Sequence, residues 1–324
     1  MADQLLLISQ RPEDVAFATV VAKAAGLQLI AAKDVAEGIK IISGESPKAT
    51  LVDASNEAMC RAFEDGIHES VGLFSEAINP NALHYISDLS IESVPYLTQS
   101  PLFGHLILRR FQGNAECADH YGRIVKATLQ PRSFGLQTLM KPGTRIQSLK
   151  LVSSDQKQSA VDAIKNYIIA AKFQSRIASL VSNAIDEILM NAIFDAPTDP
   201  LGKQLYISTP RSTVIKLEGK SEVEMQVGFD GTYVGITAID KFGSLDKAKL
   251  LAHVTKVYTE EEYKIKTSQA GAGIGLATVY KTGGSFFFSS ESRERTEVTV
   301  FFRKTDSYRE FRDQFRFFST QFYF

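Results

Sequence analysis

The sequence predicts an α/β protein with two domains, a doubly wound parallel sheet followed by a domain of helices and antiparallel strands. The chain has 324 residues, which is enough for two domains that each bury a core. Over the first hundred residues, short apolar runs alternate with helical segments, as is typical of a parallel sheet. The second half instead has two helical segments and then strand-like segments joined by turns, as is typical of an antiparallel sheet.

The composition is that of a soluble globular protein, with 44% apolar and 23% charged residues. A net charge of −1 gives no electrostatic reason to expect nucleic acid or an anionic membrane as a partner. No apolar run approaches the length of a membrane span, and the acidic N-terminus is unlike a signal peptide. Cys60 and Cys117 lack metal-ligand spacing and are expected to be free thiols in a reducing compartment. We therefore expect a cytoplasmic protein.

The first domain is predicted from a β-α-β-α-β order. Its strands are expected at residues 5–8, 27–31 and 49–53, and its helices at residues 16–25 and 34–42. Asp34 is a suitable N-cap for the second helix. A sheet of this kind has its functional sites beyond the C-terminal ends of its strands, and Asp53 stands at such an end.

On this order and on Asp53, residues 3–110 resemble a response-regulator receiver domain, a family in which the third strand ends in a phosphorylatable aspartate. Two departures are visible. Ser9-Gln10 stands where the family has an acidic pair for Mg²⁺, and Gln99-Ser100-Pro101 stands where it has a lysine before a proline after the last strand. These departures favour a pseudo-receiver that serves as a binding or dimerisation module, with a short fourth helix and with Asp53 as a strand-end acid or helix cap.

Residues 106–127 are predicted to be largely helical and to lead into a segment rich in proline and glycine. We place a pseudo-receiver-like domain with its connector helix at 1–128, a linker at 129–143, the second domain at 144–306 and an aromatic tail at 307–324. His105 and His120 are expected to be ordinary surface histidines, because no acid directly follows either of them. The tail is expected to pack on either domain or on a second subunit.

In the second domain, a helix predicted over residues 175–194 places Glu187 and Asn191 one turn apart on one edge. A carboxylate beside a carboxamide can bind Mg²⁺ and phosphate: the amide oxygen ligates the metal, and the carboxylate orients or deprotonates a nucleophile. An isolated pair with this spacing is more often a solvated helix edge.

Strands of the second domain are predicted at residues 145–152, 204–208, 222–229, 233–239, 285–289 and 296–302. Asp230-Gly231 is expected to join two of them as a hairpin. A further turn, Asp240-Lys241-Phe242-Gly243, follows the hairpin. Its aspartate could accept a hydrogen bond from a ligand amine while the glycine lets the chain turn closely, although both residues are also common in ordinary turns.

A glycine-rich stretch follows, in which Gly271, Gly273 and Gly275 alternate with other residues and Leu276 begins an apolar helical run. Free N–H groups at such a helix start can bind phosphate. Taken alone, the stretch is equally typical of a hinge or tight turn. The polar residues before it, about 252–270 and including Lys266, predict a mobile loop.

The order of these patterns over residues 144–304 resembles the GHKL ATPases, which include histidine kinases, gyrase-type ATPases and anti-sigma-factor kinases. The resemblance implies an α+β two-layer sandwich, the Bergerat fold, that binds ATP and Mg²⁺. It implies that Glu187 is a general base, that Asn191 ligates Mg²⁺ and that Asp240 contacts the adenine amino group. It also implies that the remaining cofactor-binding residues shape the adenine pocket or wrap the phosphates: Gly243, Lys266, Gly271, Gly273, Gly275 and Leu276.

The start of this domain looks most like the anti-sigma serine kinases. Phe242 and Ser244 stand where many members have a second glycine, and Phe194-Asp195 stands where a histidine or basic residue is common. ATP binding is therefore expected, while phosphoryl transfer is left open. Three functions remain: a Ser/Thr protein kinase controlled by the pseudo-receiver, a non-catalytic ATP-dependent binding switch, and a histidine kinase acting on another chain. We expect a protein partner such as a sigma factor, an antagonist or another signalling protein, no nucleic acid or membrane, and a homodimer.

Overall fold

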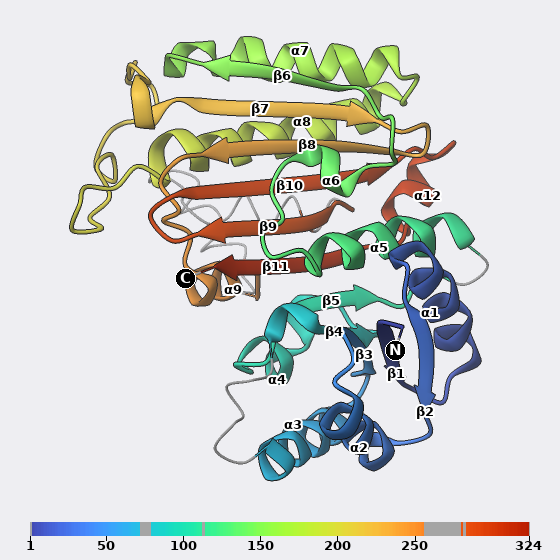
Figure 1. Ribbon diagram of the computed structural model, residues 1–324. Coiled ribbons are helices and arrows are strands. Elements are labelled where there is room, and N and C mark those ends of the chain that lie inside the picture. The colour runs from blue at the N-terminus through green and yellow to red at the C-terminus, as the bar shows by residue number, and fades with distance from the viewer. Residues whose placement is uncertain (1, 72–78, 112–113, 256–279, 281–282, 324) are drawn as a thin grey trace. The chain divides into compact units, whose positions relative to one another are not determined.

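The structure is a computed structural model that describes residues 2–71, 79–111, 114–255, 280 and 283–323. The protein is of the α/β class, and the chain forms two compact units (Figure 1). The first unit comprises Met1–Ser133 and Phe315–Thr320, and the second comprises Phe134–Gln314 and Gln321–Phe324.

The first unit has five neighbouring parallel strands in the order β2-β1-β3-β4-β5. They are β1 (Gln4–Ile8), β2 (Gln28–Ala32), β3 (Ala49–Asp53), β4 (Leu83–Ser87) and β5 (His105–Leu108). Its helices are α1 (Pro12–Ala25), α2 (Val35–Glu45), α3 (Glu57–Val71), α4 (Pro95–Thr98) and α5 (Ala115–Thr128), with 3₁₀ turns at Pro80–Ala82 and Ile91–Ser93. The predicted β-α-β-α-β order is therefore confirmed. The short fourth helix was expected between residues 86 and 94, where the structure has only the 3₁₀ turn, and α4 instead lies at Pro95–Thr98.

The central strands are buried because helices cover the sheet. Leu5, Leu6 and Leu7 are fully buried, as expected for a parallel strand. The helix α1 packs against α5, and α2 packs against α3. Gly122 allows the first of these contacts, since a Cβ there would lie 2.5 Å from the Cβ of Ala24. The cap of α2 is as predicted, with Asp34 Oδ1 accepting from the N–H of Glu37 at 2.8 Å.

Two predictions for the connector were wrong. The last parallel strand, β5, lies within the segment predicted to be helical, because Leu106 and Ile107 are fully buried and pair with β4. Gln99–Pro101 therefore precedes the last strand, and Arg109 is the residue that follows it. His105 and His120 are not surface residues, since both are fully buried.

The second unit has five neighbouring strands in the order β9-β10-β8-β7-β6, and all the pairings are antiparallel. The strands are β6 (Ile146–Leu151), β7 (Val223–Phe229), β8 (Tyr233–Asp240), β9 (Ser285–Glu291) and β10 (Arg295–Arg303). The helices are α6 (Leu136–Leu139), α7 (Lys157–Ala170), α8 (Ser175–Met190), α9 (Lys247–Thr255) and α12 (Tyr308–Arg312), with 3₁₀ turns at Ser154–Gln156 and Gly219–Ser221 and a π-helical turn at Asn191–Asp195. The hairpin between β7 and β8 is as predicted, with Asp230 Oδ1 accepting from the N–H groups of Thr232 and Tyr233.

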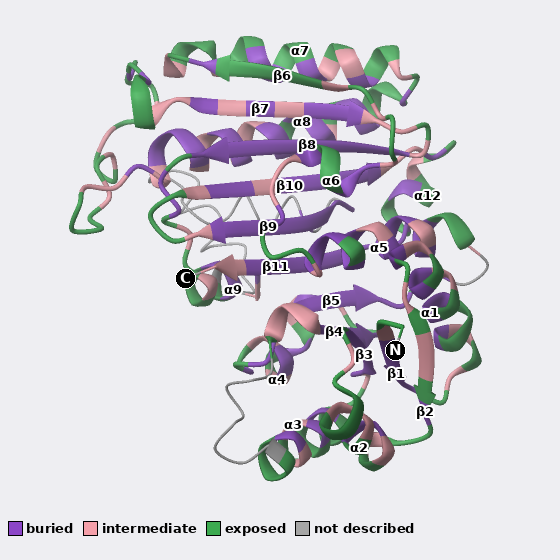
Figure 2. Cartoon of the chain, in the orientation of Figure 1, coloured by how far each residue is buried: buried purple, intermediate pink, exposed green. Residues whose placement is uncertain are grey.

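The two faces of this sheet differ. The N-terminal end of α6 is bonded to one face, where the N–H of Leu136 donates to Gln226 Oε1 at 3.2 Å. The helices α7 and α8 pack together, and α8 packs against β8 on the other face (Figure 1). Figure 2 shows β8 buried along its length. Since side chains alternate along a strand, Asp240 points to the face opposite Ile239.

One described helical stretch, Ser175–Asp195, has the length and composition of a membrane-spanning helix, and 61% of its apolar window is buried inside the protein. A helix buried in this way is typical of the core of a soluble protein.

The predicted strand at residues 204–208 is absent from the described residues. Gln204 makes only an isolated bridge with Thr198, and the surrounding segment consists of turns. The segment keeps large apolar side chains in solvent, including Leu201, which is 94% exposed.

The aromatic tail divides between the units. Phe311, in α12, is buried beside Phe302 in the second unit, with ring centroids 5.8 Å apart. The strand β11 (Phe317–Tyr323) runs antiparallel to β5 in the first unit, pairing through Phe317–Ser319. The ring of Phe317 lies 5.2 Å from that of Tyr121. The tail thus contributes to both cores.

Candidate functional site

The C-terminal end of α8 carries the predicted Glu187 and Asn191. The helix changes there into the π-helical turn that begins at Asn191, and the N–H of Ala196 donates to the carbonyl oxygen of Asn191 at 2.8 Å. Both side chains are half-buried. Within the described part of the chain, neither side chain forms a hydrogen bond. Both are therefore available to a ligand.

The carboxyl group of Glu187 is electrostatically perturbed. Burial raises its pKa to about 7, and the charges of Asp195 and Asp186 act in the same direction. Arg211 and Lys157 oppose the shift. A carboxyl group with a pKa near neutrality can accept and release a proton at physiological pH, as a general base must.

Asp240 is the last residue of β8 and is only 5% exposed. Burial raises the pKa of its carboxyl to about 7, against hydrogen bonds from the N–H groups of Phe242 and Gly243 and from the Thr296 side chain. The bond from Phe242 N to Oδ1 is 2.8 Å long. Among the described residues Asp240 has no ion-pair partner. A buried polar group of this kind suits the recognition of an uncharged ligand edge.

Gly243 is required by a close backbone approach. Its φ is +58°, and a Cβ at this position would lie 1.9 Å from the carbonyl oxygen of Glu291. The turn after β8 therefore lies directly against the hairpin of β9 and β10. Ser244 then joins this turn to the end of α8, because its Oγ donates to the carbonyl oxygen of Ala196 at 2.7 Å. The structure thus links the element that carries Asp240 to the element that carries Asn191.

The glycine-rich stretch lies outside the described residues. This applies to Gly271, Gly273, Gly275 and Leu276, to Lys266 and to most of the loop predicted at 252–270. Among the residues that are described, no group of three or more metal-ligating side chains could hold a metal ion. Such a group is not needed for Mg²⁺ bound with a nucleotide, since this ion keeps waters and phosphate oxygens around one or two protein ligands. Asn191 is therefore compatible with the predicted role.

Sequence reasoning missed Arg211. Its Nη2 donates to Asp195 Oδ1 at 2.7 Å, and its guanidinium carbon lies 4.9 Å from the centre of the Phe194 ring. Arg211 comes from the turns after the π-helical segment, where no sequence pattern indicated a partner. It nevertheless brings a cation to the position where Phe194-Asp195 suggested that none was present.

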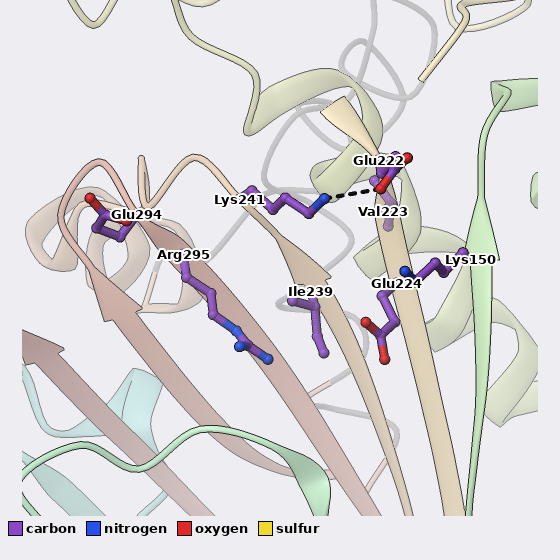
Figure 3. A pocket seen from close by; sticks show the side chains of 8 residues that line it. All are labelled: Lys150, Glu222, Val223, Glu224, Ile239, Lys241, Glu294 and Arg295. Carbon is purple, nitrogen blue, oxygen red and sulfur yellow. Dashed lines mark hydrogen bonds and ion pairs between the residues drawn. The ribbon is translucent and has the colours of Figure 1, made fainter. Parts of the chain in front are cut away.

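A surface pocket of the second unit lies elsewhere (Figure 3). Its lining residues come mainly from β6, β7, β8 and β10: Lys150, Glu222, Val223, Glu224, Ile239, Lys241, Glu294 and Arg295. None of the predicted site residues lines it. Ile239 lines it, so it opens on the sheet face opposite the Asp240 side chain. Its Lys241 and Glu222 pair with each other at 3.0 Å.

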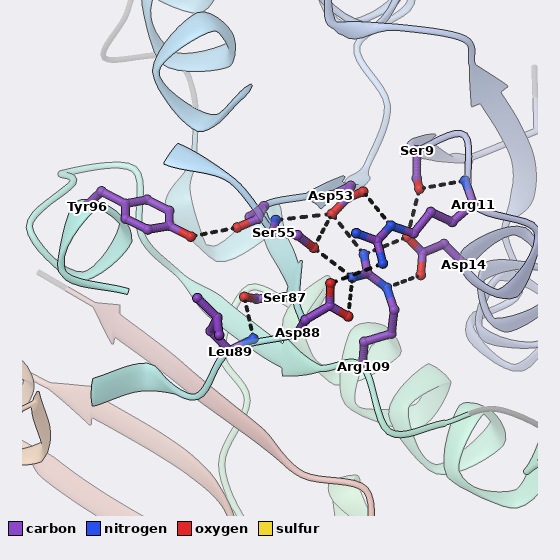
Figure 4. Close-up of polar contacts among 11 residues, drawn as sticks. Ser9, Arg11, Asp14, Asp53, Ser55, Ser87, Asp88, Leu89, Tyr96 and Arg109 are labelled. Carbon is purple, nitrogen blue, oxygen red and sulfur yellow. Dashed lines mark hydrogen bonds and ion pairs between the residues drawn. The ribbon is translucent and has the colours of Figure 1, made fainter. Parts of the chain in front are cut away.

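The first unit also gathers charged groups at the ends of its strands (Figure 4). Arg109, with a side chain only 2% exposed, donates through Nε to Asp14 Oδ1, through Nη2 to Asp53 Oδ1 and through Nη1 to Asp88 Oδ1, each at 2.8 Å. Arg11 reaches Asp53 and Asp88 from the solvent side. Although Gln99-Ser100-Pro101 lacks the lysine of the receiver family, the structure does place a cation at this edge, which is Arg109.

These contacts decide the protonation of Asp53. Burial alone would raise its pKa, but hydrogen bonds from Ser55 and Arg109 outweigh burial and lower it. The Asp53 Oδ1 atom accepts from Ser55 Oγ at 2.6 Å as well as from Arg109. The carboxylate is thus ionised and engaged with its own chain.

Comparison with known proteins does not identify a relative: no protein-family model and no curated protein gives a significant match. The candidate site therefore rests on the geometry of Glu187, Asn191, Asp240 and Gly243.

Proposed function

We propose that the chain is a signalling protein that binds ATP with Mg²⁺ in its second unit and acts as a serine/threonine protein kinase of the anti-sigma-factor type. The observation that carries this proposal is the link between two elements. The Asp240–Gly243 turn is bonded through Ser244 to Ala196, the residue that ends the π-helical turn beginning at Asn191. This π-helical turn directly follows the helix α8 that carries Glu187. This bond supports a single site that holds both a buried carboxyl group for recognition and a potential metal ligand.

In this proposal, Asp240 accepts a hydrogen bond from the adenine amino group, and Gly243 lets the turn close around the base. Asn191 holds Mg²⁺ through its amide oxygen. Glu187, with its pKa near 7, removes the proton of the attacking hydroxyl group. Gly271, Gly273 and Gly275, with Lys266 and Leu276, are assigned to the phosphates on the sequence resemblance alone.

The finer architecture belongs to the same proposal. The strand order β2-β1-β3-β4-β5 supports a receiver-like first unit, and the antiparallel sheet with α7 and α8 on one face supports a GHKL, or Bergerat, second unit. The contacts of Asp53 with Arg109 and Ser55 support a receiver-like unit that is not phosphorylated. We further propose a cytoplasmic homodimer with a protein partner, such as a sigma factor or its antagonist.

The first experiment measures nucleotide binding. ATP with Mg²⁺ should raise the Tm of the full chain, because a ligand of the folded state stabilises it. Asp240→Asn should weaken ATP binding about tenfold or more, because the hydrogen bond from the ligand to the buried carboxyl oxygen is replaced by a mismatched contact with an amide group. Asp230→Asn, a matched change at the other end of β8, should leave binding unchanged. Absence of any ATP-dependent shift in the wild-type protein would refute the proposal.

A second candidate function is a binding switch without phosphoryl transfer. The observation that favours it is that no described residue hydrogen-bonds to Glu187, whereas a catalytic base is usually oriented by a further group. Incubation with labelled ATP, Mg²⁺ and candidate partners separates the two. Phosphoserine or phosphothreonine on a partner, lost in Glu187→Gln, supports the kinase. ATP-dependent partner binding without transfer supports the switch, and acid-labile phosphate would instead indicate a histidine kinase acting on another chain.

A further inference from the structure

Five charged side chains surround the end of α8. Three are the carboxyl groups of Asp186, Glu187 and Asp195, and two are the cations Lys157 and Arg211. Lys157 forms an ion pair with Asp186, and Arg211 forms one with Asp195. Glu187 has no such partner among the described residues. The region is therefore acidic overall and would repel a polyphosphate unless a cation faced it.

Arg211 has donor capacity left after its ion pair. Its Nη2 is used by Asp195, but its Nη1 is buried and has no hydrogen-bond partner in the described structure. A buried donor without an acceptor is costly, and such groups usually have a partner in the functional state of a protein. Its side chain is 24% exposed, so the guanidinium is sheltered without being sealed from solvent.

The guanidinium is also held in place. It lies 4.9 Å from the centre of the Phe194 ring, an arrangement that favours a fixed cation. The segment that supplies it is tied to the same turn, because Gln204 Nε2 donates to the carbonyl oxygen of Asp195 at 2.8 Å. Arg211 is thus oriented by the elements that follow Asn191, although it belongs to an irregular part of the chain.

We propose that Arg211 binds the terminal phosphates of the nucleotide, with Asp195 as the group that orients it. This inference rests on the proposed ATP site. Asp195 accepts from Nη2 of the planar guanidinium. Nη1, which is buried and has no acceptor in the described structure, would donate to a phosphate oxygen, since arginine recognises phosphate through charge-assisted hydrogen bonds. Arg211 also offsets the charge of Asp195 and so removes a repulsion between the site and a triphosphate.

The test compares ligands that differ in phosphate number. The affinities of the full chain for ATP, ADP and adenosine are measured by calorimetry for the wild-type protein and for Arg211→Met. The variant should bind ATP about 10- to 100-fold more weakly, the range expected for a lost charge-assisted hydrogen bond, and should bind adenosine as the wild type does. Arg211→Lys should lose less ATP affinity than Arg211→Met, because lysine keeps the positive charge although it lacks the paired N–H donors of the guanidinium group.

Arg176→Met is the matched control. Arg176 also stacks on an aromatic ring, that of Tyr308, at 3.8 Å, and it lies on α8 about 16 Å from Glu187 along the axis. Its removal changes the net charge equally and should leave the preference for ATP over adenosine unchanged. Equal ATP affinities of Arg211→Met and the wild type would overturn the inference, as would an equal loss for adenosine. If the wild type itself binds none of the three ligands, the proposed ATP site has failed, which is a distinguishable result.

Should Arg211→Met not fold, as shown by loss of the nucleotide-free melting transition, Arg211→Lys carries the test. In that case, an ATP-to-adenosine preference of Arg211→Lys equal to that of the wild type would overturn the assignment.

Discussion

Asp53 in the first unit and Asp240 in the second both end a buried strand, and their residues are 6% and 5% exposed. Their surroundings differ. Asp53 accepts hydrogen bonds from Arg109 and Ser55, which hold its pKa below the usual value. Asp240 has no ion-pair partner among the described residues, and burial raises its pKa to about 7.

The difference indicates what each carboxylate can still do. A buried carboxylate that is paired with an arginine is fixed in its charged form, and it contributes to the fold. A buried carboxyl without a counter-charge costs free energy in the ionised form and is kept where it serves recognition or catalysis. This difference supports a structural role for the charged cluster around Arg109 and is the reason why we propose a ligand site at Asp240 and Glu187.

The largest effect is expected from Arg109→Met. This change leaves Asp14 buried without a counter-charge and leaves Asp53 with Arg11 alone, and loss of one partner from a buried ion pair costs about 3–5 kcal/mol. Urea denaturation at pH 7, with a probe in the first unit, measures the free energy of unfolding. Arg11→Met is the control, because its side chain is 38% exposed and it contacts the same cluster from solvent. Equal losses in the two variants would contradict the structural role of Arg109.

Asp240→Asn should alter how stability depends on pH. The pKa of Asp240 is about 7 in the folded state and 3.8 in the unfolded state. Between these two pH values the folded state keeps a proton that the unfolded state has lost. The stability of the wild type therefore falls as the pH rises through this range. The fall is about 1.4 kcal/mol per pH unit. The wild type should therefore lose roughly 2–3 kcal/mol relative to Asp240→Asn between pH 5 and pH 7. Parallel stability curves for the two proteins would show that Asp240 is not perturbed.

Asp53→Asn should behave in the opposite way. The folded pKa of Asp53 is lowered, so its contribution is present above the unfolded pKa of 3.8 and is lost as pH falls through the folded value. The variant should be less stable by roughly 1.5–3 kcal/mol at pH 7, the usual contribution of hydrogen bonds to a charged group. The difference should stay constant from pH 5 to pH 8 and shrink below pH 4. A difference that grows on acidification would reverse the comparison.

The smallest effect is expected from Glu187→Gln. The side chain is only half-buried, and solvent screens its charge, so the free energy of unfolding should change by less than about 1 kcal/mol at pH 8. The change in stability should depend on pH in the same direction as for Asp240→Asn, because burial raises the pKa of Glu187 as well. Thermal denaturation at pH 5 and pH 8 checks this. A loss of stability larger at pH 8 than at pH 5 would place Glu187 with the structural carboxylates.

Much of the fold could be predicted because the patterns are local. The strand β3 has the predicted bounds, and Asp34 caps α2 as expected. The strand β5 could not be recognised, since a short apolar run such as Leu106-Ile107-Leu108 suits a buried helix equally well. That error hid Arg109, which stands at the end of this strand.

The candidate site was less predictable because its partners are distant in sequence. The spacing of Glu187 and Asn191 on one helix was visible, but the pairing of Arg211 with Asp195 depends on how a run of turns folds back. Asp14 was not recognised as a member of the charged cluster, because it lies beyond Ser9-Gln10. In the structure the first turn of α1 brings it to Arg109, and Ser9 Oγ donates to it at 2.7 Å. Such contacts are set by tertiary packing, which no periodicity records.

The strand β11 has a consequence for biosynthesis. The first unit receives Phe315–Thr320, whose Thr320 Oγ1 donates to the carbonyl oxygen of Gly104 at 2.8 Å. During translation, the edge of β5 and the ring of Tyr121 therefore wait for a segment that emerges long after residue 133, while chains ordinarily complete their N-terminal domain first. An exposed strand edge invites pairing with other chains in that interval. Ribosome-bound chains ending at residue 306 should accordingly leave the first unit more sensitive to protease than chains that include residue 320.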